Sequence, residues 1–338
     1  MSREQLTIDG EFHNVDEEPK ELGPKQTIIE WVYNLHHSRP AWDPIVTYEE
    51  LFRVREILGQ RICKTNLANF FYFSKLPYAN SAWPPSVLAA GYTGLARIGK
   101  NRCFEFVPLP PGQRDAFVQI ERPNGSTFYG DLRTDNGKLS DRFRRFKRDD
   151  EVRLVTVVEK SGLVSEFFKL VEKPEGAYDH NIEPMQSPLR SGSRGEADSF
   201  YIGEWLFEDG SKREFMIAVE AKKTGCDLFL SQMFHHTNLA LTIAEESGDC
   251  DMNTTPVYSL GIETVGKSQV YVIQYKPMLW SQLEDPGIAG MVVGAKAVYT
   301  FRPGVFGIGG FGMDDDDAPG DKRQGSLLTY GQQKTPKP

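Results

Sequence analysis

The sequence predicts an α/β (α+β) protein, with a mainly helical N-terminal domain and a larger C-terminal domain of strands and helices. Two observations predict this class. In the first third of the chain, apolar residues recur three and four positions apart, which is the period of amphipathic helices. Between residues 162 and 275 the pattern becomes helix, strand, strand, helix and two further strands. The 338 residues, 39% of them hydrophobic, are enough for two domains of ordinary size.

Three helices are predicted in the N-terminal part of the chain. They span residues 27–35, 48–58 and 64–74. Thr47, with Glu50 three residues later, makes a capping box for the second helix, and Gly59 ends that helix. Residues 1–25 are polar and charged without aliphatic periodicity, so we expect a mobile arm there.

A basic β-hairpin is predicted after these helices, with its turn at Gly99-Lys100-Asn101. Three helices followed by a basic hairpin resemble a winged helix-turn-helix module, which residues 26–108 would form. The third helix would then face the major groove of double-stranded DNA, and the hairpin would follow a phosphate backbone or a minor groove. The candidate DNA-binding residues are Lys64, Thr65, Asn66, Asn69, Arg97, Lys100 and Arg102. The alternative is a helical subdomain that only packs against the rest of the protein.

Residues 109–154 are interpreted as a linker with some β structure and a basic cluster. Five basic residues and two phenylalanines lie within residues 142–148. Arg144 and Arg145 would contact phosphates there, while the rings stack on a base or a sugar. A solvated charged face is the alternative, and the acidic residues 149–151 partly cancel the positive field.

The main candidate site lies where one predicted strand begins and its neighbour ends. The first strand starts at Asp198, and the second runs through the apolar residues 215–219 into Glu220-Ala221-Lys222. Because side chains alternate along a strand, Glu220 and Lys222 point to one face, which Asp198 would share. Two carboxylates and an ammonium group would then meet. Carboxylate oxygens suit Mg²⁺, which would polarise a phosphodiester and activate a bound water.

This pattern resembles the PD-(D/E)xK nuclease superfamily, the restriction endonuclease-like proteins whose core is a mixed sheet flanked by helices. The resemblance covers residues 155–280, and Ala197 stands where the superfamily usually has proline. It implies that Asp198 and Glu220 bind Mg²⁺ and that Lys222 acts on the attacking water.

Two further side chains are implied to support this site. Gln232 follows Lys222 by ten residues on the next predicted helix, as in several branches of the superfamily. Glu166, within the predicted helix at 162–170, matches an acid that some members carry.

The alternative interpretation is that Glu220 and Lys222 form an ion pair at the end of a strand. A Glu-x-Lys triplet alone is weak evidence, because both residues are common. The apolar residues 217–219 before it indicate a buried strand, and such a strand does not usually end in charged residues without partners. His235 and His236 diverge by about 100° on the predicted helix, so at most one is expected to face the site.

The loop before Asp198 carries two arginines. Arg190 and Arg194 are candidate phosphate ligands, because a scissile strand would pass beside the metal site. An ordinary surface connection is the alternative. The nuclease domain would extend over residues 155–313, and residues 314–338 have the composition of a disordered acidic and polar tail.

Composition limits the remaining possibilities. The four cysteines form no Cys-x-x-Cys pair, so neither a zinc site nor a disulfide framework is indicated. The chain shows neither the apolar core of a signal peptide nor an apolar run of about eighteen residues, so a cytoplasmic protein without a membrane partner is expected. The net charge of −8 is unfavourable for binding DNA, but much of the excess lies at the termini, including the run Asp314–Asp317.

The sequence therefore predicts a Mg²⁺-dependent endodeoxyribonuclease, most specifically a type II restriction endonuclease that hydrolyses double-stranded DNA at a specific sequence. A homodimer is expected, since such enzymes commonly cut both strands as dimers, and a cognate methyltransferase would be a further partner. The alternatives are a structure-specific or repair nuclease, a ribonuclease, and a catalytically inactive DNA-binding regulator.

Overall fold

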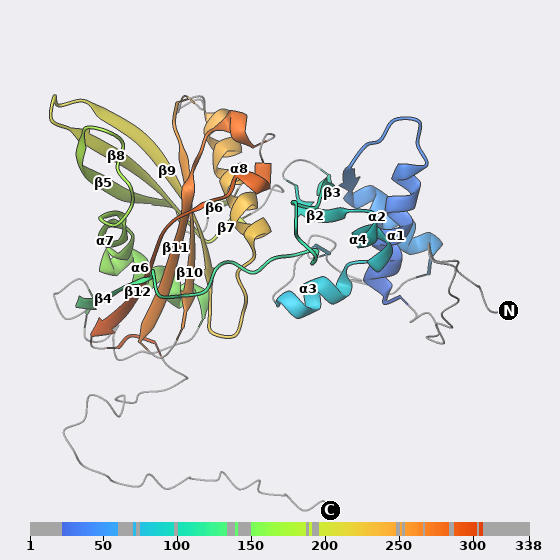
Figure 1. The fold of residues 1–338 in the computed structure, drawn as a ribbon, viewed down its shortest axis with the longest axis horizontal. Coiled ribbons are helices and arrows are strands. Elements are labelled where there is room, and N and C mark those ends of the chain that lie inside the picture. The colour runs from blue at the N-terminus through green and yellow to red at the C-terminus, as the bar shows by residue number, and fades with distance from the viewer. Residues whose placement is uncertain are drawn as a thin grey trace, which may run out of the picture.

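The computed structural model describes most of the chain between residues 22 and 306. The described ranges are 22–59, 70–71, 75–97, 101–133, 139–140, 150–186, 189–190, 196–247, 251, 254–265, 268–283, 287–302 and 304–306. They form an N-terminal domain of short helices and strands beside a C-terminal domain built on a large sheet (Figure 1). Most of the helix predicted at 64–74 lies outside these ranges, as do the basic cluster at 142–148 and the tail at 314–338.

The described part of the N-terminal domain packs helices against a three-stranded antiparallel sheet. Its elements are α1 (Pro24–His37), β1 (Ile45–Thr47), α2 (Tyr48–Ile57), α3 (Leu76–Ala82), α4 (Pro85–Ala89), β2 (Tyr92–Ala96) and β3 (Arg102–Pro108). The first two predicted helices and the hairpin are confirmed. The capping box is also present, with the Glu50 amide donating to Thr47 Oγ1 at 3.1 Å. β1 and α3 were not predicted, because segments this short leave little periodicity to detect.

A seven-stranded mixed sheet forms the centre of the C-terminal domain, in the order β4-β12-β11-β10-β9-β8-β5. Its strands are β4 (Phe128–Arg133), β5 (Ala177–Gln186), β8 (Ser199–Phe207), β9 (Lys212–Lys222), β10 (Val257–Thr264), β11 (Gln269–Met278) and β12 (Val293–Arg302). The β9–β10 and β12–β4 pairs are parallel and the other pairs are antiparallel. The α/β (α+β) class and a mixed sheet with helices are therefore confirmed.

Helices cover both faces of this sheet. α6 (Glu151–Ser161) and α7 (Leu163–Phe168) pack on one face, where apolar side chains of α6 and α7 meet Val219 and Ala221 of β9. α8 (Leu230–Ser247) packs on the other face, where Leu239 and Leu241 meet Ala218. Figure 1 shows α8 between the sheet and the N-terminal domain. Successive side chains of β9 therefore pack into two different hydrophobic cores, one on each face of the sheet.

Several elements differ from the predicted ones for identifiable reasons. Residues 109–154 contain β structure as predicted, since β4 belongs to the large sheet, but they also supply the start of α6, which was not predicted. α6 was missed because Asp150 was interpreted as part of a charged run, whereas its side chain accepts from the Arg153 amide at 2.7 Å and caps the helix. β5 was missed because this edge strand is polar and contains Pro184.

Smaller elements complete the described residues. β6 (Leu189–Arg190) pairs with β7 (Glu196–Ala197), and two 3₁₀ turns, η2 (Trp280–Gln282) and η3 (Gly287–Gly290), precede β12. None of the helices in the described residues is long and apolar enough to cross a membrane.

Candidate active site

Antiparallel pairing of β8 with β9 brings Asp198 to Glu220 and Lys222. Ser199 lies opposite Val219, so Asp198, directly before β8, lies beside the end of β9. The Asp198 carboxylate accepts a hydrogen bond from the Ala221 amide at 2.7 Å. The Asp198 amide donates to the Val219 carbonyl at 3.2 Å. The three residues that strand periodicity selected therefore lie at one place in the fold.

Glu220 and Lys222 are buried and paired with each other. Their side chains are 6% and 3% exposed, and Lys222 Nζ forms an ion pair with Glu220 Oε1. A second carboxylate, Glu151 at the start of α6, lies 3.7 Å from Lys222 Nζ. The strand-end ion pair that we gave as the alternative interpretation is thus present, at the same place as Asp198.

α8 adds a histidine to this cluster. His236 Nε2 lies 3.2 Å from Glu220 Oε2. Burial lowers the pKa of His236 to about 4, so its ring is neutral at pH 7. His235 points elsewhere, with Nδ1 3.3 Å from the Ala96 carbonyl of β2. The prediction that at most one of these histidines faces the site is confirmed.

The electrostatics of the cluster are dominated by its two carboxylates. Burial, and then the nearby Glu220, raise the pKa of Asp198 to about 6. Lys222 and the hydrogen bond from Ala221 act in the opposite direction without cancelling this rise. An added cation beside Asp198 would favour the ionised form of its carboxyl group.

Gln232 and Glu166, the two side chains implied to support the site, have their own local partners. Gln232 lies in the first turn of α8, where its side-chain oxygen accepts from the Phe229 amide at 3.1 Å. Glu166, on α7, is 41% exposed and forms an ion pair of 2.6 Å with Lys169. These contacts do not bring either side chain to Glu220.

One acid of α6 reaches the cluster instead. Glu151 contacts Lys222, whereas Glu159 accepts a hydrogen bond of 3.0 Å from Ser199, which faces the α6 side of the sheet. Sequence reasoning missed Glu151, because α6 itself was not predicted. The signal that was available is Asp150, which is a favourable N-cap residue immediately before an apolar run.

A second charged group lies on the neighbouring strand. Glu263 of β10 is opposite Lys222 in the parallel register. Arg122 forms an ion pair with this buried carboxylate and a further one of 3.3 Å with Asp227. Burial raises the pKa of Glu263 while Arg122 acts in the opposite direction. The ends of β9 and β10 therefore carry charged residues that are compensated by ion pairs.

The candidate DNA-binding residues in the described ranges are few. Arg97 forms an ion pair of 2.5 Å with the buried Glu105 on the same hairpin. Arg102 is exposed, and the backbone of Arg190 pairs with Glu196 in β6–β7. Lys64, Thr65, Asn66, Asn69, Lys100, Arg144, Arg145 and Arg194 lie outside the described residues.

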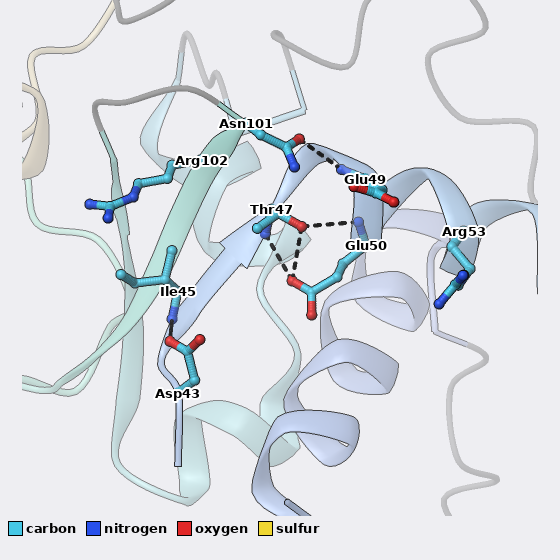
Figure 2. A pocket seen from close by; sticks show the side chains of 8 residues that line it. All are labelled: Asp43, Ile45, Thr47, Glu49, Glu50, Arg53, Asn101 and Arg102. Carbon is cyan, nitrogen blue, oxygen red and sulfur yellow. Dashed lines mark hydrogen bonds between the residues drawn. The ribbon is translucent and has the colours of Figure 1, made fainter. Parts of the chain in front are cut away.

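Arg102 is one of the residues that line a pocket of about 430 Å³ in the N-terminal domain (Figure 2). The pocket is lined by Asp43, Ile45, Thr47, Glu49, Glu50, Arg53, Asn101 and Arg102. Asn101 docks the hairpin onto the start of α2, because its carbonyl accepts from the Tyr48 amide and its side chain from the Glu49 amide. Arg53 and Arg102 are the basic side chains of this lining, and both are exposed.

The chain matches no protein-family model, no curated protein and no solved structure. Within the described residues, no group of three or more His, Cys, Asp and Glu side chains has the geometry of a metal site. Asp198 and Glu220 nevertheless fit Mg²⁺, since this ion keeps several waters and takes only one or two protein carboxylates.

Proposed function

We propose that this chain is a Mg²⁺-dependent nuclease in which Asp198 and Glu220 hold the ion and Lys222 acts on the attacking water. The observation that supports the proposal is the meeting of these three side chains where β8 begins and β9 ends. Buried carboxylates with a raised pKa are typical of functional sites, and the pKa of Asp198 is raised to about 6.

The carboxylate pair supports a divalent ion at this position. Glu220 raises the pKa of Asp198, which means that the two negative charges repel each other in the folded protein. When bound, Mg²⁺ supplies a Lewis acid that polarises a phosphodiester and lowers the pKa of its bound water. Asp198 and Glu220 would hold it through their carboxylate oxygens.

Lys222 contributes a buried positive charge to the same site. Its ammonium group is held between Glu220 and Glu151, so its position is fixed before any substrate arrives. A preorganised cation in a site that excludes water stabilises negative charge developing on a phosphate without reorganisation. Lys222 would therefore orient the attacking water and offset charge in the transition state.

Double-stranded DNA is the proposed substrate, and cleavage at a specific sequence by a restriction-type homodimer is the most specific form of the proposal. The exposed Arg53 and Arg102 on the N-terminal domain support it, because exposed arginines are suited to phosphate contacts. A structure-specific nuclease or a ribonuclease would use the same three residues and differ in the preferred substrate.

One observation favours a second candidate, a DNA-binding regulator without catalytic activity. Lys222 is only 3% exposed and already pairs with Glu220 and Glu151. A structural ion-pair network produces this arrangement without any chemistry.

Cleavage assays separate these candidates. Purified protein is incubated with unmethylated phage DNA, plasmid and structured RNA in Mg²⁺, beside Lys222→Ala and the matched control Lys212→Ala. Lys212 lies on the same strand, exposed and paired with Glu204 at 2.7 Å. Discrete DNA bands from the wild type and the control alone support the restriction-type enzyme. Nicks or a smear indicate a repair-type nuclease. Cleavage of the RNA without cleavage of the DNA indicates a ribonuclease. DNA binding without cleavage under any divalent metal supports the regulator.

A further inference from the structure

The start of α8 is built into the core of the N-terminal domain. Phe229, directly before the helix, is 3% exposed and packs in the same cluster as Phe104 and Phe106 of β3. Phe234, in the second turn, packs with Leu95 of β2 in a cluster that also contains side chains of β11. The first two turns of α8 are therefore held by both domains.

Backbone hydrogen bonds strengthen this connection. The Ile120 amide donates to the Leu228 carbonyl at 3.1 Å, and the Leu230 amide donates to the Val118 carbonyl at 3.1 Å. The short segment that contains Val118 is fixed in turn to α3, because the Phe117 amide donates to the Asn80 side chain at 2.8 Å. A shift of the N-terminal domain would therefore move the start of α8.

The same helix reaches the candidate active site two turns later. His236 follows Phe229 by seven residues, which is about 10 Å along a helix axis. Its Nε2 lies 3.2 Å from Glu220 Oε2, so a proton on Nε2 would face a carboxylate oxygen, while Lys222 pairs with the other oxygen of that carboxylate. Contacts from two elements thus meet at the Glu220 carboxylate, one from β9 and one from α8.

We propose that His236 is a positioning residue for Glu220, and that α8 makes this contact depend on how the N-terminal domain is seated. Its consequences for metal binding and for DNA rest on the proposed function, whereas the contact itself exists without metal. Hydrogen-bond donors behind a metal-binding carboxylate typically change metal affinity by about 10–100-fold when removed. DNA bound to the N-terminal domain would therefore change the contact between His236 and Glu220 by moving α8.

The contact is tested first without metal. Nitrogen-15 NMR of histidine-labelled, EDTA-treated protein distinguishes the two neutral tautomers, and His236→Gln identifies the His236 signal among the six histidines. At pH 7 the wild type is expected to carry its proton on Nε2. Phe229→Leu should shift this signal, whereas the matched control Phe106→Leu, on β3 in the same core, should not. A proton on Nδ1 in the wild type, or equal shifts in both variants, overturns the proposal.

Metal affinity is the second measurement. The full chain is titrated with Mn²⁺, and the concentration of free Mn²⁺ is measured by electron paramagnetic resonance. His236→Ala should weaken binding about tenfold, and His236→Gln, which keeps a donor at the same reach, should restore most of it. Phe229→Leu should weaken binding about threefold or more while Phe106→Leu does not. Unchanged affinity in His236→Ala overturns the positioning role. A wild type that binds no Mn²⁺ removes the proposed metal function, and the NMR result still decides the contact.

Discussion

The Asp198 carboxylate accepts its hydrogen bond from the amide of Ala221, the residue between Glu220 and Lys222. One backbone amide thus joins the first acid of the candidate site to the strand that carries the other two groups. The link does not depend on metal or substrate, because it is part of the fold. The arrangement should therefore exist in the isolated protein, and its energetics can be measured without any assay of activity.

Asp198→Asn is expected to stabilise the protein at alkaline pH. The pKa of Asp198 is raised from 3.8 to about 6, so the folded state favours the protonated carboxyl. The protonated Asp198 carboxyl contributes fully to the stability of the fold below about pH 4, and this contribution is lost as pH rises through about 6. Removing the charge should raise the free energy of unfolding at pH 8 by about 1–3 kcal/mol, with no gain at pH 4. Urea unfolding in EDTA measures this.

The control for that experiment is Asp209→Asn, in the exposed turn between β8 and β9. The pKa of Asp209 is lowered by hydrogen bonds from Ser211, so its charge is favoured by the fold and no gain at pH 8 is expected. An equal gain from Asp198→Asn at pH 4 and pH 8 would show that its charge is not the cause.

Lys222→Met is expected to destabilise the fold because it removes a buried cation. Glu220 would keep its contact with His236 but lose its ion pair with Lys222, and removal of one partner of a buried pair costs about 3 kcal/mol. Adding Glu220→Gln should recover part of that loss, since the unpaired charge is gone. The free energies of unfolding of the two single variants and the double variant measure this coupling. Strictly additive losses would contradict it.

Mg²⁺ is expected to stabilise the wild type in a concentration-dependent way. An ion that binds only the folded state adds about 2.7 kcal/mol at one hundred times its Kd. Glu220→Gln should abolish the effect, because it removes one of the proposed ligands. Glu214→Gln, exposed on the same strand, should retain it. Thermal unfolding across a Mg²⁺ series measures both. A shift that survives in Glu220→Gln would place the ion elsewhere.

Arg53 and Arg102 are expected to contribute to DNA affinity through phosphate contacts. The double change to alanine should reduce the slope of log K against log salt concentration by about 2, one for each lost contact. Arg55→Ala is the matched control, since this guanidinium lies 4.5 Å from the Phe52 ring centroid on the same helix. Fluorescence anisotropy at several salt concentrations gives the slopes. Equal slopes for all three proteins would remove this face from the DNA interface.

Strand periodicity and the resemblance to the nuclease superfamily together selected the central residues of the candidate site. Alternation placed Glu220 and Lys222 on one face, and the antiparallel pairing of β8 with β9 then brings Asp198 to them. Helix periodicity limited His235 and His236 to one contact but could not choose between them. That choice depends on how α8 packs between two domains, which is a long-range property.

The residues that sequence reasoning missed belong to elements whose local signal was masked by charge. Asp150 caps α6, and Glu151 extends from that helix to Lys222, yet the acidic run at 149–151 was interpreted only as partly cancelling the positive field of the basic cluster before it. Gln232 was assigned to the site by its spacing, but its side chain is used to cap α8. Spacing along the chain does not determine which partner a polar side chain meets.

The parallel pairing of β4 with β12 places the first and the last strand of the large sheet side by side. Arg302 and Asp131, 171 residues apart, are joined there by an ion pair of 2.9 Å. At typical synthesis rates of about 5–20 residues per second, β4 leaves the ribosome roughly 10–30 seconds before its partner exists. The high contact order of this pairing predicts slow folding. A fragment that begins at residue 155 would leave the β12 edge open to association with other chains.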